Sequence, residues 1–211
     1  MKFRMAALIA ALALASFGTA DAETAKPVAT VPAKVVETKA ALRDLWLSHV
    51  FWVRNVVQAR LANDASRSKT AEQEVVANAK ALAASIEPFY GKAASEKLFE
   101  LLAGHWSAIS DYLDATNSSN KANADAAERK LLANAEEIST FLSGANPNLP
   151  VGTLRSMLNA HGAHHMQQIQ QLEAKQYAQE AKTWTAMKDH MYVIADALAD
   201  GIAKQFPEKF R

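Results

Sequence analysis

The 211-residue chain contains no cysteine, and this absence removes several kinds of chemistry. Disulfide bonds and thiolate metal ligands are excluded, and so is the C-x-x-C-H motif that attaches c-type haem. The sequence also lacks the H-E-x-x-H motif of zinc proteases, the E-x-x-H pairs of di-iron bundles and any phosphate-binding glycine loop. Any metal site must therefore be built from histidine, methionine, carboxylate or amide side chains.

An excess of either charge is also missing, since 23 Lys and Arg residues stand against 22 Asp and Glu residues. Nucleic-acid binding relies on clustered cations that neutralise phosphates, so the balanced charge argues against a nucleic-acid partner. Beyond the N-terminus no uncharged apolar run approaches the roughly 20 residues of a membrane span, and we expect no membrane-embedded segment. The sequence offers no nucleophile, so it predicts no catalytic residue, and it identifies no protein partner.

The N-terminus has the order of a secretory signal peptide. Two basic residues precede a short apolar run, and small residues then lead to a cleavage site after Ala22. We therefore expect residues 1–22 to be removed and the protein to be periplasmic or secreted. Residues 23–36 combine Ala, Pro, Val and Thr, which predicts an extended spacer in front of a single domain at 37–211.

The sequence does contain polar residues at a regularly repeated spacing. Three histidines are separated by equal intervals: His49, His105 and His161. Three further polar residues follow them, each at the same shorter distance from its histidine: Asn78, Asn134 and His190. The pattern L-x-x-[LM]-[WL]-x-x-H ends at each of the first three histidines. Repeats near this length are usually helical hairpins.

Apolar residues around these positions recur at steps of three, four and seven, which is the periodicity of amphipathic helices. Turn-forming segments lie at 63–68, 88–91, 117–123 and 146–152, and the repeat places a fifth connection at 174–180. We therefore predict an all-α protein, a six-helix up-and-down bundle. It would consist of three helical-hairpin repeats, each of about 56 residues, at about 37–90, 91–147 and 148–211.

The six repeated polar residues fall on the apolar faces of these helices, at one level of the bundle. An unpaired buried polar group costs about 1–3 kcal/mol, so they must bond to one another, to water or to a ligand. Neutral imidazole is a common ligand for copper, zinc, nickel and iron. We therefore predict a transition-metal site with the ligands His49, His105, His161 and His190. Hydrogen bonds to the ring nitrogens facing away from the ion are expected from Asn78 and Asn134.

The third repeat favours copper, with zinc as the second choice, for metal sensing, carriage or storage. Three of its methionines occupy inward positions near the histidines and are secondary ligand candidates: Met157, Met187 and Met191. Thioether together with imidazole favours copper. His165 is a further secondary candidate, because the corresponding positions in the other repeats are apolar. The alternative is that these methionines simply fill the core.

Other functions fit the same residues. The His/Asn layer could be a hydrogen-bond network that fixes helix register in a structural or partner-binding bundle. Non-covalent haem between facing histidines is a second alternative. The aromatic cluster of Trp46, Phe51 and Trp52 could line a small-molecule pocket, although large aromatics in a helical core are more often packing residues.

Four segments carry a family resemblance: LWLSHVFWVRNVV (45–57), IEPFYG (86–91), NAEEISTFLSGANPNLP (134–150) and DHMYVIADALADGIAKQFPEKF (189–210). They resemble an uncharacterised family of bacterial, often exported, helical proteins with motifs such as LWxxHVxWTR, IKPYYG, NADEIAxFLSxANPNWP and MADxLSxGIxxQFPxKF. The resemblance implies a helical, exported protein and adds no activity. The four primary histidines belong to the shared pattern, whereas similar proteins have a hydroxyl residue in place of His165.

Overall fold

The computed structural model describes residues 31–211, which form helices and no strand. Six long helices follow one another: α1 (Ala33–Leu61), α2 (Ala65–Ala84), α4 (Lys92–Asn117), α5 (Lys121–Ala145), α6 (Val151–Glu173) and α7 (Tyr177–Gln205). Two single-turn helices, α3 (Glu87–Tyr90) and the 3-10 helix η1 (Pro207–Phe210), precede α4 and follow α7. The prediction of an all-α protein with six packed helices is confirmed.

Three of these helices end with the same local backbone conformation. One residue in each of the tight α1–α2, α4–α5 and α6–α7 connections has a positive φ, of 56°, 54° and 56°: Asn63, Ser119 and Lys175. A left-handed residue directly after the last helical turn is a common way to end a helix. The α6–α7 connection contains neither Gly nor Pro, so the spacing of the repeat is the one sequence signal for its position.

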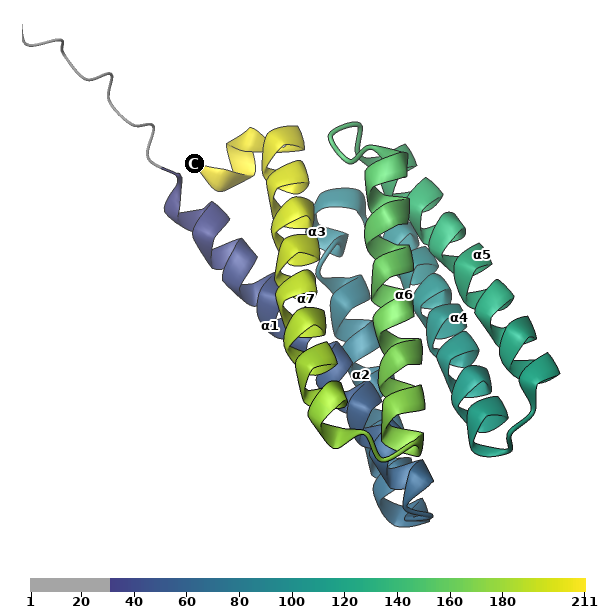
Figure 1. The fold of residues 1–211 in the computed structure, drawn as a ribbon. Coiled ribbons are helices and arrows are strands. Elements are labelled where there is room, and N and C mark those ends of the chain that lie inside the picture. Colours follow the sequence, from purple (N-terminus) through teal and green to yellow (C-terminus); the bar gives the residue numbers. More distant parts are fainter. Residues whose placement is uncertain (1–30) are drawn as a thin grey trace, which may run out of the picture. The chain divides into compact units, whose positions relative to one another are not determined.

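Each tight connection joins two antiparallel helices, so that α1 packs on α2, α4 on α5, and α6 on α7. Contacts between α2 and α4, α5 and α6, and α7 and α1 close these three hairpins into a ring, and α6 also touches α1 and α4. Figure 1 shows the three hairpin turns at one end of the bundle, and α3, η1 and the α5–α6 loop at the other. The first helices of the hairpins, α1, α4 and α6, therefore run in the same direction.

The helical domain begins earlier than the sequence predicted, at Ala33 rather than Glu37. Pro32 sets the backbone at the start of α1, and Val35 is buried against Ile202 and Phe210 at the end of the chain. This apolar contact holds the first turn of α1 in the domain. The predicted signal peptide and cleavage site, and most of the predicted spacer, lie outside the described residues. Within residues 31–211, every helix is too short or too polar to cross a membrane.

Most of the apolar core belongs to two clusters, one toward the hairpin turns and one toward the opposite end. The hairpin half is the cluster nearest the three hairpin turns; it includes Val53, Val56, Ile109, Leu113 and Ile169. The capped half is the cluster toward the opposite end; it includes Leu42, Trp46, Leu82, Leu98 and Met187.

The end of the capped half is closed by α3 and η1. Phe89 of α3 stacks on Phe210 of η1 with ring centroids 5.8 Å apart, and Phe206 packs against Phe89 and Tyr90. The Tyr90 hydroxyl donates to the Gln205 side chain at 2.8 Å and accepts from the Asn146 amide at 2.9 Å. These contacts join α3, the α5–α6 loop and the end of α7 into a cap.

Candidate functional site

Four histidines converge where α1, α4 and α6 approach one another. His49 lies on α1, His105 on α4, and both His161 and His165 on α6, one helical turn apart. Each is at most 4% exposed, and each offers one ring nitrogen within 4.8 Å of those of the other three. This arrangement follows from the sequence pattern, because each histidine belongs to the apolar stripe of its helix. We call these four residues the histidine cluster.

The distances within the histidine cluster are close to those of a coordination shell. Nitrogens bound tetrahedrally to an ion at about 2.0 Å would lie about 3.3 Å from one another. The Nε2 atoms of His161 and His165 are already 3.2 Å apart and form a hydrogen bond. The ring centroids of His49, His105 and His161 are 5.4–6.2 Å apart in pairs. One ring nitrogen from each of the four residues lies within 4.8 Å of the others, so an ion would draw them closer by rotation of the side chains.

Burial keeps the histidine cluster uncharged at neutral pH. It lowers the pKa of His49 from 6.5 to about 3, with a smaller contribution from the neighbouring His105. The pKa of His105 falls to about 4, again mainly through burial, although the Asn134 amide beside it acts in the opposite direction. Burial and the neighbouring histidines bring the pKa values of His161 and His165 well below 6.5. A neutral imidazole has a lone pair available for a metal without first losing a proton.

Five ring nitrogens of the histidine cluster are buried without a hydrogen-bond partner in the protein: Nδ1 and Nε2 of His49, Nδ1 and Nε2 of His105, and Nδ1 of His161. Each such atom costs about 1–3 kcal/mol if it stays unpaired. Among the described residues of the cluster and the predicted layer, the one hydrogen bond between two imidazole rings is that of His161 and His165. The rings thus satisfy one another poorly, and their unpaired atoms suit a ligand.

The second set of repeated polar residues forms different hydrogen bonds from those that the sequence predicted. Three side chains donate to or pair with a backbone carbonyl 33 residues earlier: Asn78 with Leu45 at 2.9 Å, Asn134 with Leu101 at 3.0 Å, and His190 with Met157 at 2.8 Å. These carbonyls lie one turn before His49, His105 and His161. These hydrogen bonds join the two helices of each hairpin at the level of the histidine cluster.

This arrangement separates His190 from the predicted primary ligands. It is absent from the group of nitrogens within 4.8 Å, whereas His165, a secondary candidate from the sequence, belongs to that group. The predicted hydrogen bonds from Asn78 and Asn134 to the rings are not formed with ordinary geometry, and the amide oxygens of both residues stay unpaired. Asn134 nevertheless lies close enough to His105 to affect its pKa.

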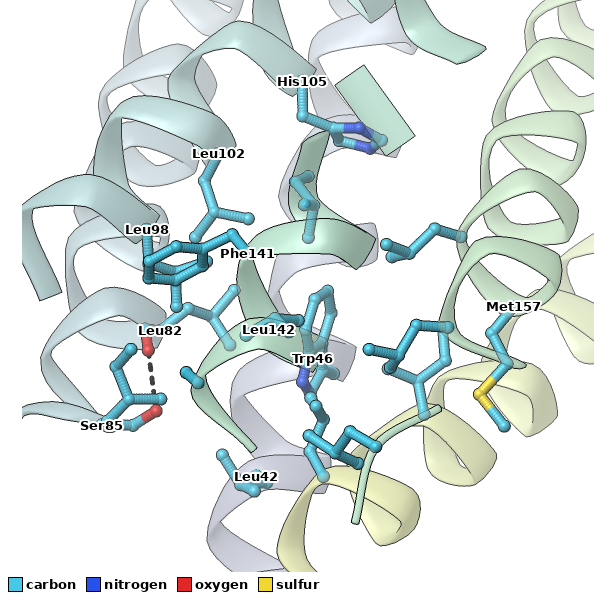
Figure 2. Close-up of a pocket in the computed structure, with 18 of the residues that line it drawn as sticks. Leu42, Trp46, Leu82, Ser85, Leu98, Leu102, His105, Phe141, Leu142 and Met157 are labelled. Carbon is cyan, nitrogen blue, oxygen red and sulfur yellow. Dashed lines mark hydrogen bonds between the residues drawn. The ribbon is translucent and has the colours of Figure 1, made fainter. Parts of the chain in front are cut away.

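The methionines lie in the apolar core. Met187 and Met191 are fully buried members of the capped half, and Met157 packs against the same cluster from a partly exposed position. Figure 2 shows the Met157 side chain apart from the His105 ring. Core packing accounts for all three contacts.

A cavity of about 60 Å³ adjoins the histidine cluster in the capped half. His49, His105 and His161 line it, and His165 does not. Its other walls are almost entirely aliphatic and aromatic, and it extends from the histidines to Tyr90 and Ile202 at the cap. Figure 2 shows His105 at one end of this group of side chains, with Leu42 and Ser85 at the other. The open side of the histidine cluster therefore faces away from His165.

Two further features lie in this region, of which the sequence offered only the first, as an alternative. In the aromatic cluster that could line a small-molecule pocket, Trp46 lines the cavity, whereas Phe51 and Trp52 do not. The Trp46 indole meets the His49 and His161 rings edge-on, at centroid distances of 6.0 and 6.3 Å. The positions 56 and 112 residues later hold Leu102 and Leu158, so the tryptophan departs from the spacing pattern.

The second feature is a buried ion pair. Glu180 is 2% exposed and accepts two hydrogen bonds from the Arg54 guanidinium, at 2.6 and 2.7 Å, and a third from Gln168 at 3.0 Å. The hydrogen bonds link α1, α6 and α7. The carboxylate is fully satisfied by protein partners, so the pair holds the helices together and leaves no atom for a ligand.

Comparison with known proteins does not extend these observations, since no protein-family model, curated protein or solved structure matches the chain. The family resemblance of its motifs stays a prediction.

Proposed function

We propose that the protein binds one transition-metal ion through His49, His105, His161 and His165, and that it serves in metal sensing, carriage or storage. The observation that supports this most strongly is the histidine cluster itself: four neutral, buried imidazoles within 4.8 Å, five of whose nitrogens lack protein partners. A bound ion would use lone pairs that otherwise have no partner in the core. The ion would supply charge and, if it is copper, redox chemistry.

Copper is our first choice and zinc our second, on grounds that differ from those in the sequence. The methionines pack in the apolar core, so the argument rests on the nitrogen donors, for which copper has the highest affinity among divalent first-row ions. No carboxylate belongs to the cluster among the described residues. A divalent ion held by four neutral imidazoles would keep both charges in an apolar core, which is costly. Copper can also bind as a monovalent ion, which halves that charge, whereas zinc cannot; this is a second reason to place copper before zinc.

The alternatives fit the geometry less well. A hydrogen-bond network would pair the rings with one another and with the amides, yet the described cluster contains one such bond. Haem requires a pocket of several hundred Å³, as ligands of that size do, and the cavity beside the histidines has about 60 Å³. A haem would have to push the helices apart.

Export and the threefold repeat complete the proposal. Export is supported by the basic, apolar and small-residue order of the first 22 residues. The division into three helical-hairpin repeats is supported by three equally spaced left-handed turn residues. It is also supported by three side-chain hydrogen bonds, each to a backbone carbonyl 33 residues earlier. A repeated hairpin explains how three histidines reach one level from distant parts of the chain.

The decisive experiment is elemental analysis of untagged protein. The full chain is produced in a bacterial host supplied with copper, the periplasmic protein is purified, and the copper content per chain is measured. We expect about one copper per chain and at least a tenfold loss of copper affinity for His105→Ala, because one ligand is removed.

His164→Ala is the matched control. It removes an imidazole from the same helix as His161, but His164 lies outside the cluster, half-buried, with its ring against His190. This variant should keep the copper of the original chain. Metal-free protein from copper- and zinc-supplied cells, with affinities unchanged by His105→Ala, would reject the proposal.

A further inference from the structure

The cavity in the capped half has the dimensions of a binding site for a molecule much smaller than a typical cofactor. A cavity of about 150 Å³ in another protein holds the six carbons of benzene, which is about 25 Å³ for each non-hydrogen atom. On that scale, a volume of about 60 Å³ has room for about two or three such atoms. The size points to a ligand with no more than about three non-hydrogen atoms.

The walls select against charge. No Lys, Arg, Asp or Glu side chain lines the cavity, and an unpaired ion would lose its hydration there without compensation. Two of its polar wall groups are already bonded: the Ser85 hydroxyl donates to the Leu82 carbonyl at 2.7 Å, and the Tyr90 hydroxyl belongs to the cap. An uncharged, largely apolar molecule is the chemical class that fits.

Outside the histidine cluster, one group of the wall is a donor without a partner. Trp46 is 8% exposed, and its indole N–H has no hydrogen-bond acceptor within the protein. Figure 2 shows the indole ring among the lining side chains, with its nitrogen on the side turned away from His105. The two corresponding positions of the sequence hold Leu102 and Leu158, which line the same cavity and offer no donor. Trp46 therefore supplies a polar anchor that simple filling of the core does not require.

We propose that this cavity binds a small uncharged molecule, of about two or three non-hydrogen atoms, that carries one hydrogen-bond acceptor for the Trp46 indole N–H. The ligand lies on the open side of the histidine cluster, between the three imidazoles and the cap. Its binding does not require a metal in the cluster, so this inference stands apart from the proposed metal site.

The test uses acetonitrile, with three non-hydrogen atoms and one nitrogen acceptor, as the probe, and the metal-free full-length protein after export. The indole N–H signals of ¹⁵N-labelled protein are followed during titration, and Trp46→Phe assigns the Trp46 signal. We expect a saturable shift of that signal alone, while the signals of Trp52, Trp106 and Trp184 stay in place. Ethylammonium, with the same number of non-hydrogen atoms and a charge, should leave the Trp46 signal unchanged.

Xenon binding reports on the apolar space of the cavity without the hydrogen bond to Trp46. Trp46→Phe keeps a ring on the wall and removes the donor. It should weaken acetonitrile binding about two- to tenfold, the value of one neutral hydrogen bond, and leave xenon binding within about twofold. Failure of both probes to bind the original protein would overturn the proposal, as would equal binding of ethylammonium. Copper content, measured on the same preparation, reports on the metal site separately.

Discussion

The two halves of the core are built from similar residues but packed to different degrees. In the hairpin half, Val53, Val56, Ile109, Leu113 and Ile169 are each at most 1% exposed and interlock close to the hairpin turns. The capped half has more large side chains, including Trp46 and two buried methionines, and still contains a cavity of about 60 Å³. Well-packed interiors rarely contain such voids, because a void forfeits dispersion contacts on its walls.

The histidine cluster lies at the boundary between these halves, and the difference explains its asymmetry. On the side of the hairpin half, His165 of α6 takes the place that Val53 occupies on α1 and Ile109 on α4. Apolar side chains close that side. On the capped side, His49, His105 and His161 face the cavity. The hairpin half thus fixes the cluster in place, whereas the capped half leaves room beside it.

Acid should destabilise the protein through the buried histidines between the two halves, and this is the largest effect we predict. The pKa of His49 is about 3 and that of His105 about 4 in the folded protein, against 6.5 when unfolded. The unfolded chain therefore binds more protons below pH 6.5, and the stability that is fully present above that pH is lost as the pH falls. Each buried histidine contributes up to about 1.4 kcal/mol per pH unit. Urea unfolding of metal-free protein between pH 7.5 and 5 measures this loss.

The slope of unfolding free energy against pH gives the number of protons taken up. We expect it to approach four protons near pH 5, where most carboxylates are still ionised, and to fall by about one in His165→Leu. A stability that is flat over this range would mean that the imidazoles are accessible to water and protons in the folded state.

Leucine truncations compare the packing of the two halves directly. Leu113→Ala in the hairpin half should cost about 4–5 kcal/mol, the upper part of the range for buried leucines, because its neighbours cannot collapse into the space. Leu102→Ala in the cavity wall should cost about 2–3 kcal/mol, since that side chain already lacks contacts on one side. Urea unfolding at pH 7.5 measures both. Equal costs would show that the cavity is absent in solution.

Much of this fold follows from periodicity. Helix steps in the apolar residues indicate all six long helices. The equal spacing places the α6–α7 turn within 174–180, where neither Gly nor Pro marks it, and the structure has this turn at Lys175. The start of α1 was misplaced, because the contact that orders Val35 comes from Phe210 at the other end of the chain. A local pattern carries no information about such a distant partner.

The site was less predictable than the fold. Spacing indicates that His49, His105 and His161 share one level, since equal intervals in an up-and-down bundle return to the same depth. The same spacing also predicted His190 as a primary ligand, although His190 lies on α7 rather than on α1, α4 or α6 and its ring pairs with a backbone carbonyl. His165 was ranked lower because it breaks the pattern. Rotation about the helix axis decides which side chains meet, and a spacing in sequence does not determine that rotation.

Enlarging an alanine in each half should have opposite effects of moderate size. Ala145→Leu places a larger side chain at the cavity wall and should stabilise the protein by about 1 kcal/mol. Ala108→Leu adds the same atoms to the filled hairpin half, where the alanine is fully buried, and should destabilise it by about 1–3 kcal/mol. Urea unfolding midpoints of the two variants give the sign of each effect. Destabilisation by both would mean that the cavity does not accept additional atoms.

His190→Asn should have the smallest effect, because it replaces one hydrogen bond between side chain and backbone carbonyl by another of the same kind. Asn78 and Asn134 already bond the carbonyls of Leu45 and Leu101 at the same 33-residue separation at which His190 pairs with Met157. An asparagine at 190 can make the equivalent bond, so we expect stability within about 0.5 kcal/mol of the original and an unchanged copper content. Urea unfolding and elemental analysis of the same preparation test both expectations. Loss of copper with unchanged stability would instead make His190 a ligand, and would require α7 to rotate its ring toward His161 when the ion binds.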